Sequence, residues 1–291
     1  MKSLREYIQQ AEETKTAIGH FNISDIVGFW AVVGAAKNLK VPVIIGVSEG
    51  ERDFIGIRQV KALVDTLKAE GMSIFLNADH TYSVDRVKEV VDAGFDAVII
   101  DEADKNLEEN IKTTREAIEY AKNKNPNTRL NDRVGQVLVE AELGFIGKSS
   151  KLLDELPDGV SKITVEEARE FCEKTGVDLF APAVGNVHGM MRNGKEPKLD
   201  INLIKEIKEA TGIPLVLHGG SGNTDDDFRA AIEAGISIIH INTEIRLAYK
   251  QALQKFFSEN PDETTPYKFL RPALLAMQSV VDRRLRLFNN L

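Results

Sequence analysis

The chain has 291 residues, a formal net charge of −8 at pH 7 and a sequence pI of about 5.3. This acidic balance, with charges spread along the sequence, argues against nucleic acid as a partner. The opening residues form no basic and apolar leader, and the longest apolar run, residues 26–36, is too short to span a bilayer, so we expect neither a signal peptide nor a membrane span.

Eight apolar runs rich in β-branched residues are predicted to be strands. Several of them are continuously apolar rather than alternating, as expected for strands that are covered on both faces. The predicted strands are residues 16–21, 41–47, 73–77, 97–100, 137–142, 179–184, 215–217 and 238–241.

Amphipathic helical stretches separate these strands. Residues 163–176, for example, open with Thr164 and Glu167 in capping-box spacing and close at Gly176. This stretch holds the only cysteine, Cys172, which we interpret as a packed residue; a single cysteine excludes an internal disulfide and fits the reducing cytoplasm.

The alternation of strand and helix continues through the chain, which predicts a parallel sheet with right-handed crossovers. We therefore expect one domain over residues 1–291, an α/β (β/α)8 TIM barrel with additional N- and C-terminal helices, residues 3–14 and 268–289, that cap the barrel or pack against a partner. An open doubly wound sheet is the alternative, but no G-x-G-x-x-G follows the first strand.

All five histidines lie at or just beyond the end of a predicted strand, where a parallel barrel gathers its chemistry. They are His20, His80, His188, His218 and His240. Three of these, from the third, sixth and seventh strands, would form a site of three imidazoles for Zn²⁺ with a coordination position left for substrate. A packed or hydrogen-bonded histidine is the alternative at each position.

Carboxylates stand near the same strand ends. Asp79 precedes His80, Asp101 ends the fourth strand, and Glu140 and Glu142 share one face of the fifth because strand side chains alternate. Taken singly, each acid fits an ion pair at the mouth of the barrel as well as a metal.

An anion site is predicted beside the histidines. The seventh strand is followed by glycines that let backbone N–H groups approach a phosphate, and by a serine hydroxyl. The eighth strand ends in neutral donors, and an arginine follows His188 by four residues. The residues concerned are Gly219, Gly220, Ser221, Asn242, Thr243 and Arg192.

These motifs resemble the class II, metal-dependent ketose-bisphosphate aldolases, which split fructose or tagatose 1,6-bisphosphate. The resemblance covers nearly the whole chain, and its most specific parts are VEAELG, GNVHG and LHGGSG in this order. It implies a cytoplasmic, zinc-dependent carbon–carbon lyase that acts on a sugar phosphate and assembles as a homodimer or homotetramer.

The resemblance also implies roles for individual residues. His80, His188 and His218 would be the ligands of the catalytic zinc, and Asp79 the acid/base that transfers a proton. Two acids match positions that hold a second or displaced metal, and several residues match positions that bind the dihydroxyacetone phosphate half of the substrate. The acids are Asp101 and Glu142; the phosphate-side residues are Gly189, Gly219, Gly220, Ser221 and Thr243. The segment after VEAELG, residues 145–162, matches a mobile loop, and its length predicts a lid.

The sequence departs from the family pattern at three places. His240 stands where an asparagine contacts dihydroxyacetone phosphate, and His20 stands where a small residue is common. Since strands one and eight are neighbours in a closed barrel, we expect these two rings to face each other across a hydrogen-bonding distance. The proton-exchanging acid of the loop has no clear counterpart, with Glu155 as a candidate.

Two alternatives to the ketose bisphosphate aldolase remain open. One is the same metal-dependent chemistry on a different keto sugar or keto sugar phosphate. The other is a non-catalytic protein that binds sugar phosphates, although such a protein would not need Asp79 beside its metal. A Schiff-base enzyme is disfavoured, because no lysine stands out at the strand ends.

Overall fold

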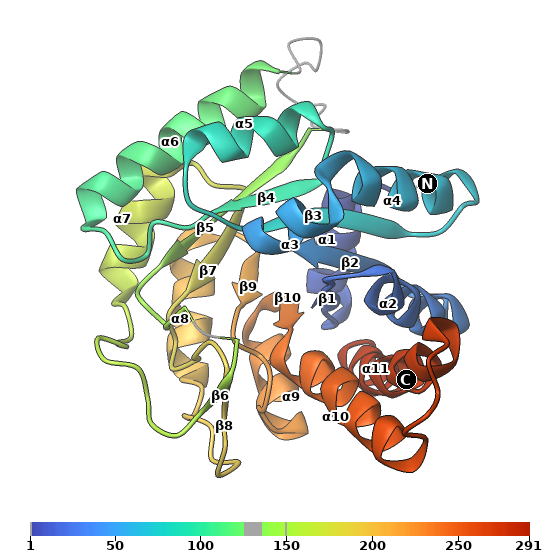
Figure 1. The fold of residues 1–291 in the computed structure, drawn as a ribbon. Coiled ribbons are helices and arrows are strands. Elements are labelled where there is room, and N and C mark those ends of the chain that lie inside the picture. The colour runs from blue at the N-terminus through green and yellow to red at the C-terminus, as the bar shows by residue number, and fades with distance from the viewer. Residues whose placement is uncertain (1, 125–135, 149) are drawn as a thin grey trace.

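The computed structural model describes residues 2–124, 136–148 and 150–291. Eight parallel strands close into a barrel in the order β1-β10-β9-β7-β5-β4-β3-β2, which confirms the predicted fold (Figure 1). The barrel strands are β1 (Ile18–Asn22), β2 (Val43–Val47), β3 (Ile74–Thr81), β4 (Ala97–Ile100), β5 (Leu138–Leu143), β7 (Leu179–Pro182), β9 (Leu215–Leu217) and β10 (Ile236–Ile241).

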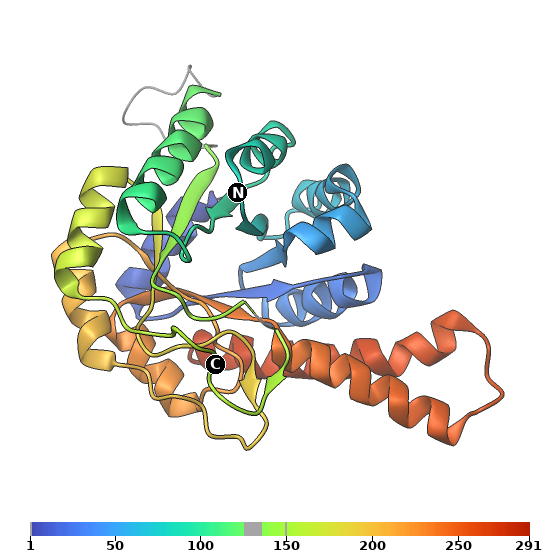
Figure 2. The same ribbon diagram turned by 60° about the vertical axis from the view of Figure 1, so that its left-hand side comes forward.

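Helices surround the barrel on its outside, and the last two form a hairpin that projects from it (Figure 2). Among the described residues, no helix is long and apolar enough to cross a membrane. The helices are α1 (Leu4–Thr14), α2 (Ile26–Leu39), α3 (Glu49–Ile55), α4 (Ile57–Ala69), α5 (Val84–Asp92), α6 (Leu107–Asn123), α7 (Val165–Thr175), α8 (Ile201–Thr211), α9 (Asp225–Ala234), α10 (Thr243–Glu259) and α11 (Pro266–Phe288).

The local signals that predict α7 are confirmed. Thr164 and Glu167 form a capping box, and Gly176 ends the helix in a left-handed conformation with φ of 68°. Cys172 is buried on the inner side of this helix, and burial raises the pKa of its thiol to about 12. The thiol therefore stays protonated, which agrees with a packed residue.

The interior of the barrel changes character along its axis. At the N-terminal end, the inward side chains of the strands are apolar and pack against α1, whose residues Leu4, Ile8 and Ala11 close that end. Further along each strand, the next inward positions are polar. The inward residues in sequence are Ile18, His20 and Asn22 on β1, Phe75, Asn77 and Asp79 on β3, Leu138, Glu140 and Glu142 on β5, and Ile238 and His240 on β10.

The end of β3 breaks the alternation of side chains. Regular alternation would send Asp79 and His80 to opposite faces of the barrel. Instead, the pairing of β3 with β4 shifts register between Ala78 and Thr81, and His80 adopts a left-handed backbone with φ of 40°. This irregularity lets both neighbouring side chains reach the mouth of the barrel.

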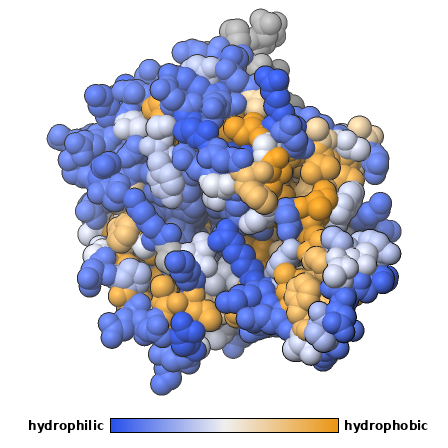
Figure 3. All heavy atoms as spheres, viewed as in Figure 1, coloured by the Kyte–Doolittle hydropathy of each residue, from blue (hydrophilic) through white to orange (hydrophobic). Residues whose placement is uncertain are grey.

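Two short strands, β6 (Leu152–Leu153) and β8 (Met190–Met191), pair with each other outside the barrel. Apolar side chains gather on the side of the molecule that carries α2, α3 and the α10–α11 hairpin, whereas the side of α5, α6 and α7 is mostly hydrophilic (Figure 3). The exposed apolar residues of the first region include Ile26, Trp30, Phe54, Tyr267 and Leu275.

Candidate active site

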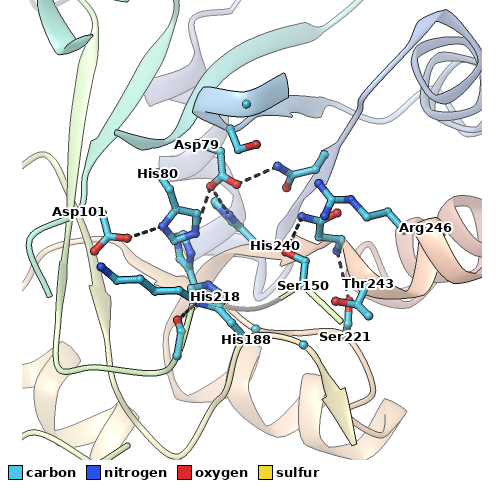
Figure 4. Close-up of a pocket in the computed structure, with 18 of the residues that line it drawn as sticks. Asp79, His80, Asp101, Ser150, His188, His218, Ser221, His240, Thr243 and Arg246 are labelled. Atoms are coloured by element: carbon cyan, nitrogen blue, oxygen red, sulfur yellow. Dashed lines mark hydrogen bonds and ion pairs between the residues drawn. The ribbon is translucent and has the colours of Figure 1, made fainter. Parts of the chain in front are cut away.

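Three histidines meet at the C-terminal mouth of the barrel, as predicted (Figure 4). The ring centroid of His80 lies 4.7 Å from that of His188 and 5.0 Å from that of His218, and the centroids of His188 and His218 lie 5.7 Å apart. Glu142 joins them, since one potential ligand atom from each of the four residues lies within 4.8 Å of the others. The fold thus assembles three nitrogens and a carboxylate from strands that are far apart in the sequence.

Each imidazole has one nitrogen held by an oxygen acceptor. Nδ1 of His80 lies 2.7 Å from a carboxylate oxygen of Asp101, Nδ1 of His188 donates to the carbonyl of Gly147 at 2.6 Å, and Nε2 of His218 lies 2.7 Å from Glu140. The other nitrogen of each ring faces the shared centre. Acceptors of this kind fix the tautomer and orientation of metal-binding histidines.

Asp101 is not part of this four-residue group, and its predicted role at a second or displaced metal stays a prediction. Its carboxylate is engaged with His80 and with the backbone N–H of Ala103 at 3.2 Å, so it orients a ligand from behind rather than joining the cluster. Glu142 does lie within the cluster. Glu140, which the sequence analysis left open, holds the ring of His218.

The electrostatic environment differs between the histidines of the cluster. Burial by itself lowers the pKa of His80, but the carboxylates of Asp79 and Asp101 raise it to about 10. Burial and the neighbouring His80 lower the pKa of His188 to about 3, and burial together with Asp101 raises the pKa of Glu142 well above its usual range. Asp79 and Asp101 thus stabilise a positive charge on His80, whereas burial beside His80 keeps His188 neutral.

The residues fit a divalent metal ion such as zinc. One oxygen of Glu142, Oε2, is buried without a hydrogen-bond partner, and it lies 3.7 Å from Nδ1 of His218. A buried acceptor without a donor is costly unless a ligand satisfies it. Imidazole nitrogens and carboxylate oxygens are both zinc ligands, and catalytic zinc sites use three such protein ligands with one position left open.

Asp79 has one carboxylate oxygen fixed and one free. Nδ2 of Asn22 donates to Oδ2 at 2.8 Å, whereas Oδ1 has no hydrogen-bond partner and lies 3.4 Å from His240 and 3.8 Å from His80. Burial would raise the pKa of this carboxyl, but His80 and His240 hold it well below its usual range. Asn22 was missed in the sequence, although it is the next inward position after His20.

His20 and His240 are register neighbours on β1 and β10, as expected. The two rings face each other, as predicted, and they do so by stacking, with centroids 3.5 Å apart and planes at 5°. His240 also packs on His218, with centroids 3.9 Å apart. Room for the stack comes from Gly46 on β2, because a β-carbon there would lie 2.1 Å from Cε1 of His20.

A cavity of about 260 Å³ opens beside the cluster. Oγ of Ser221 accepts the backbone N–H groups of Asn242 at 3.2 Å and Glu244 at 3.3 Å. Both lone pairs of this hydroxyl are therefore occupied, and its proton is left to donate into the cavity. Six of the predicted phosphate-side residues line it: Gly189, Gly219, Ser221, His240, Asn242 and Thr243.

Gly220, the next predicted residue, does not line the cavity. Its N–H donates to the carbonyl of His240 at 3.2 Å, and a β-carbon there would lie 2.8 Å from the same oxygen. The glycine therefore permits close packing of two strands, and its predicted contact with phosphate is corrected.

Arg192 does not reach the cavity either. It lies in the turn that follows β8, pairs with Asp154 at 2.8 Å and has a side chain that is 58% exposed. Two other cations line the cavity, Arg246 and Lys148. Arg246 pairs with Glu51, and Lys148 pairs with Asp104 at 2.7 Å. Arg246 follows Thr243 by three residues on α10, a helical spacing that could have identified it.

The predicted lid, residues 145–162 apart from position 149, lies against the segment that carries His188. The carbonyls of Ile146, Lys151 and Leu153 accept the N–H groups of His188, Met190 and Arg192 at 2.9, 3.1 and 2.8 Å. Gly147, Lys148 and Ser150 line the cavity, whereas Glu155 is exposed and does not. Opening of this segment stays a prediction.

Comparison with known proteins agrees with this geometry. The family model for class II fructose-bisphosphate aldolase matches residues 2–291. The chain is 34% identical to the fructose-bisphosphate aldolase of Geobacillus stearothermophilus, over 99% of this chain and 96% of that protein, and 35% identical to that of Staphylococcus epidermidis, over 98% and 96%.

Solved structures show the same architecture. The YdjI aldolase from Escherichia coli K12 superimposes with a TM-score of 0.78 at 27% identity, over 99% of this chain and 96% of that chain. A putative fructose-1,6-bisphosphate aldolase from Coccidioides immitis gives 0.80 at 26%, over 98% and 96%. With the family pattern matched from end to end, the chain belongs to the class II fructose-bisphosphate aldolases.

Proposed function

We propose that this protein is a zinc-dependent aldolase that cleaves a ketose 1,6-bisphosphate, of the fructose or tagatose type, reversibly to dihydroxyacetone phosphate and an aldehyde phosphate. The observation that carries the proposal is the convergence of three imidazoles and Glu142 beside Asp79, a carboxylate with one unpartnered oxygen. Family membership supports the dependence on a metal.

His80, His188 and His218 would hold the catalytic ion, and Glu142 lies where it could bind the same ion in a displaced position or a second one. Bound there, the metal supplies a Lewis acid that polarises the substrate carbonyl and offsets the negative charge left by carbon–carbon cleavage. Asp101 and Glu140 keep the imidazoles of His80 and His218 turned toward this point.

Asp79 would accept the proton of the C4 hydroxyl during cleavage and return it during condensation. Its low pKa keeps it ionised, and Asn22 binds one oxygen, which leaves Oδ1 to take the proton. A positioned acid/base of this kind contributes about 10²–10⁴-fold to a rate. The same unpartnered oxygen argues against a protein that only binds sugar phosphates.

The phosphate of the dihydroxyacetone half would bind at Ser221, Gly219, Gly189 and Thr243. The hydroxyl of Ser221 is poised to donate, and α10 begins at Thr243 beside the cavity. The positive end of a helix dipole favours an anion at that place. Asn242, the residue before α10, offers a further amide.

One observation favours the alternative of a different keto sugar phosphate. The cavity cations that could bind a second phosphate, Arg246 and Lys148, are already paired with Glu51 and Asp104. A distal phosphate must therefore displace or share these acids, whereas a substrate with a single phosphate need not.

A panel of ketose mono- and bisphosphates, assayed with and without a chelator, tests the proposal and separates these substrates. We expect about one zinc per chain after purification without chelator, cleavage of a bisphosphate, and loss of activity in EDTA. Activity that persists in EDTA with no bound metal contradicts the metal role. Cleavage of monophosphates alone supports the alternative substrate, and binding without cleavage supports the non-catalytic one.

We further propose that the protein forms a homodimer or homotetramer in the cytoplasm. The exposed apolar residues on α2, α3 and α11 support a contact between subunits, because large apolar patches commonly mark interaction sites. The single cysteine supports a reducing compartment. Sedimentation analysis at several concentrations measures the state of assembly, and a monomer at all of them contradicts this proposal.

A further inference from the structure

A buried arginine of the C-terminal helix forms an ion pair with a glutamate next to the loop that follows β9. Arg284, on α11, has a side chain that is only 6% exposed. Its Nη2 donates to Oε1 of Glu244 at 2.6 Å, and its Nε donates to Oε2 at 3.0 Å. The guanidinium also lies over the ring of Phe228, 4.7 Å from its centroid. A forked pair stacked on an aromatic ring fixes the orientation of both charged groups.

Glu244 passes this restraint to the loop that follows β9. Its Oε1 accepts the N–H of Gly222 at 2.9 Å, and its own N–H donates to Oγ of Ser221 at 3.3 Å. Gly222 has φ of 92°, a conformation that a side chain would strain. Glu244 therefore holds two consecutive residues of the loop, Gly222 through its carboxylate and Ser221 through its backbone N–H.

The same guanidinium holds the far end of the loop. Nη1 of Arg284 donates to Asp225 at 2.9 Å, and Nη2 lies 3.4 Å from the carbonyl of Asn223. Residues 221–225 are thus tied to α10 and α11 through Arg284 and Glu244. Neither Arg284 nor Glu244 lines the cavity.

A buried ion pair contributes little net stability, because desolvation of two charges offsets much of their attraction. What this pair adds over apolar packing is direction: its carboxylate orients the N–H of Gly222, and the residue that carries this carboxylate orients the hydroxyl of Ser221 through its backbone N–H. We propose that Arg284 is a positioning residue that, through Glu244, holds Ser221 in the arrangement that binds the phosphate group of the substrate. This inference rests on the phosphate site of the proposed function.

A matched substitution tests it. Arg284→Lys keeps the charge but loses the fork, and Arg283→Lys makes the same change at a neighbour whose Nη2 lies 3.5 Å from Glu244 but whose side chain is 61% exposed. Calorimetry would measure the Kd of glycerol 3-phosphate, a phosphate monoester without a carbonyl, and separately the Kd of zinc.

We expect Arg284→Lys to weaken binding of glycerol 3-phosphate about tenfold or more, as for loss of hydrogen bonds to a charged group. Zinc affinity should stay within about twofold, because no ligand of the metal cluster contacts the pair. For the cleaved substrate, KM should rise while kcat changes less than about threefold, the signature of lost ground-state binding. Arg283→Lys should behave as wild type in each measurement.

The outcomes separate a failure of the positioning role of Arg284 from a failure of the phosphate site itself. A folded Arg284→Lys protein that binds glycerol 3-phosphate as wild type does overturns the positioning role. A wild-type protein that does not bind it overturns the phosphate site itself, and the inference with it. If Arg284→Lys does not fold, the double substitution Arg284→Met with Glu244→Gln removes both charges together and leaves neither buried alone. That protein should show the same loss of phosphate affinity, and normal affinity again overturns the inference.

Discussion

One carboxylate oxygen of Asp79 accepts a hydrogen bond from Asn22, and the other has no hydrogen-bond partner. Substitution of Asp79 should therefore affect catalysis more than structure. In Asp79→Asn, the amide can keep the contact with Asn22 but cannot accept a proton. We expect zinc content to be retained and carbon–carbon cleavage to slow about 10²-fold or more. Metal analysis and steady-state kinetics measure both quantities.

The matched control for this substitution is Asp85→Asn, which changes an exposed aspartate that pairs with Lys88 on the same side of α5. It should leave turnover unchanged. If Asp79→Asn kept most of the wild-type rate, Asp79 would not be the acid/base. If it lost zinc, the carboxylate would instead be needed to hold the metal site.

His240 is a second residue whose environment makes a distinct prediction. Its ring is stacked between His20 and His218, its Nδ1 faces Asp79, and its Nε2 is buried without a partner. If Nε2 binds a substrate oxygen, His240→Asn should lower kcat/KM for the preferred substrate about three- to tenfold, as for one hydrogen bond of about 1 kcal/mol, and alter the preference among ketose phosphates.

The same panel of substrates measures this change, with zinc content as the control for the neighbouring His218. An unchanged preference and unchanged kcat/KM would mean that the ring only fills the barrel interior.

At the scale of elements, the strands are predicted correctly along their apolar residues, but a strand end formed by polar residues is missed. The third strand was predicted to end at residue 77, but β3 continues to Thr81 because its last residues face the mouth. The register shift beside His80 has no sequence signal, since it arises from pairing with β4. Histidine positions could be predicted because the ends of parallel strands meet at one edge of a barrel.

The misassigned residues share a physical reason. Arg192 was placed near the phosphate by its separation of four from His188, yet only a helix brings such residues together. The chain there is not helical: it bends at His188 and Gly189, passes through the short strand β8 and turns at Arg192. Gly220 has the predicted location but a different partner. Partners depend on the direction of groups across strands, which spacing alone does not specify.

The lid is an element whose motion can be measured. Three backbone hydrogen bonds tie residues 145–162 to the segment that carries His188, and three residues of the lid line the cavity. Without ligand, amide hydrogen exchange should be faster in this segment than in β5, and zinc with a phosphorylated substrate analogue should slow it. Equally slow exchange with and without ligand would mean that the segment is a fixed wall.

At the scale of the whole molecule, the barrel separates chemistry from stability along one axis. The C-terminal half of its interior is polar, with His20, Asp79, Glu140, Glu142, His218 and His240 buried at or near the mouth. Burial of so many polar groups opposes folding. The apolar layer below, closed by α1, offsets this cost, and the α1 helix is therefore part of the core rather than an appendage.

A substitution in α1 tests this division. Ile8 is 1% exposed inside the apolar layer, whereas Gln9 next to it is exposed. Ile8→Ala should lower the free energy of unfolding by about 2–4 kcal/mol, and Gln9→Ala should change it by less than about 0.5 kcal/mol, both measured by urea denaturation.

Zinc content and turnover of the folded Ile8→Ala protein should match wild type, because the metal cluster lies at the opposite end of the barrel. Equal effects of the two substitutions on unfolding would mean that α1 does not fill the barrel. A loss of zinc in folded Ile8→Ala would mean that the two layers are coupled, and that the geometry of the mouth depends on how its base is closed.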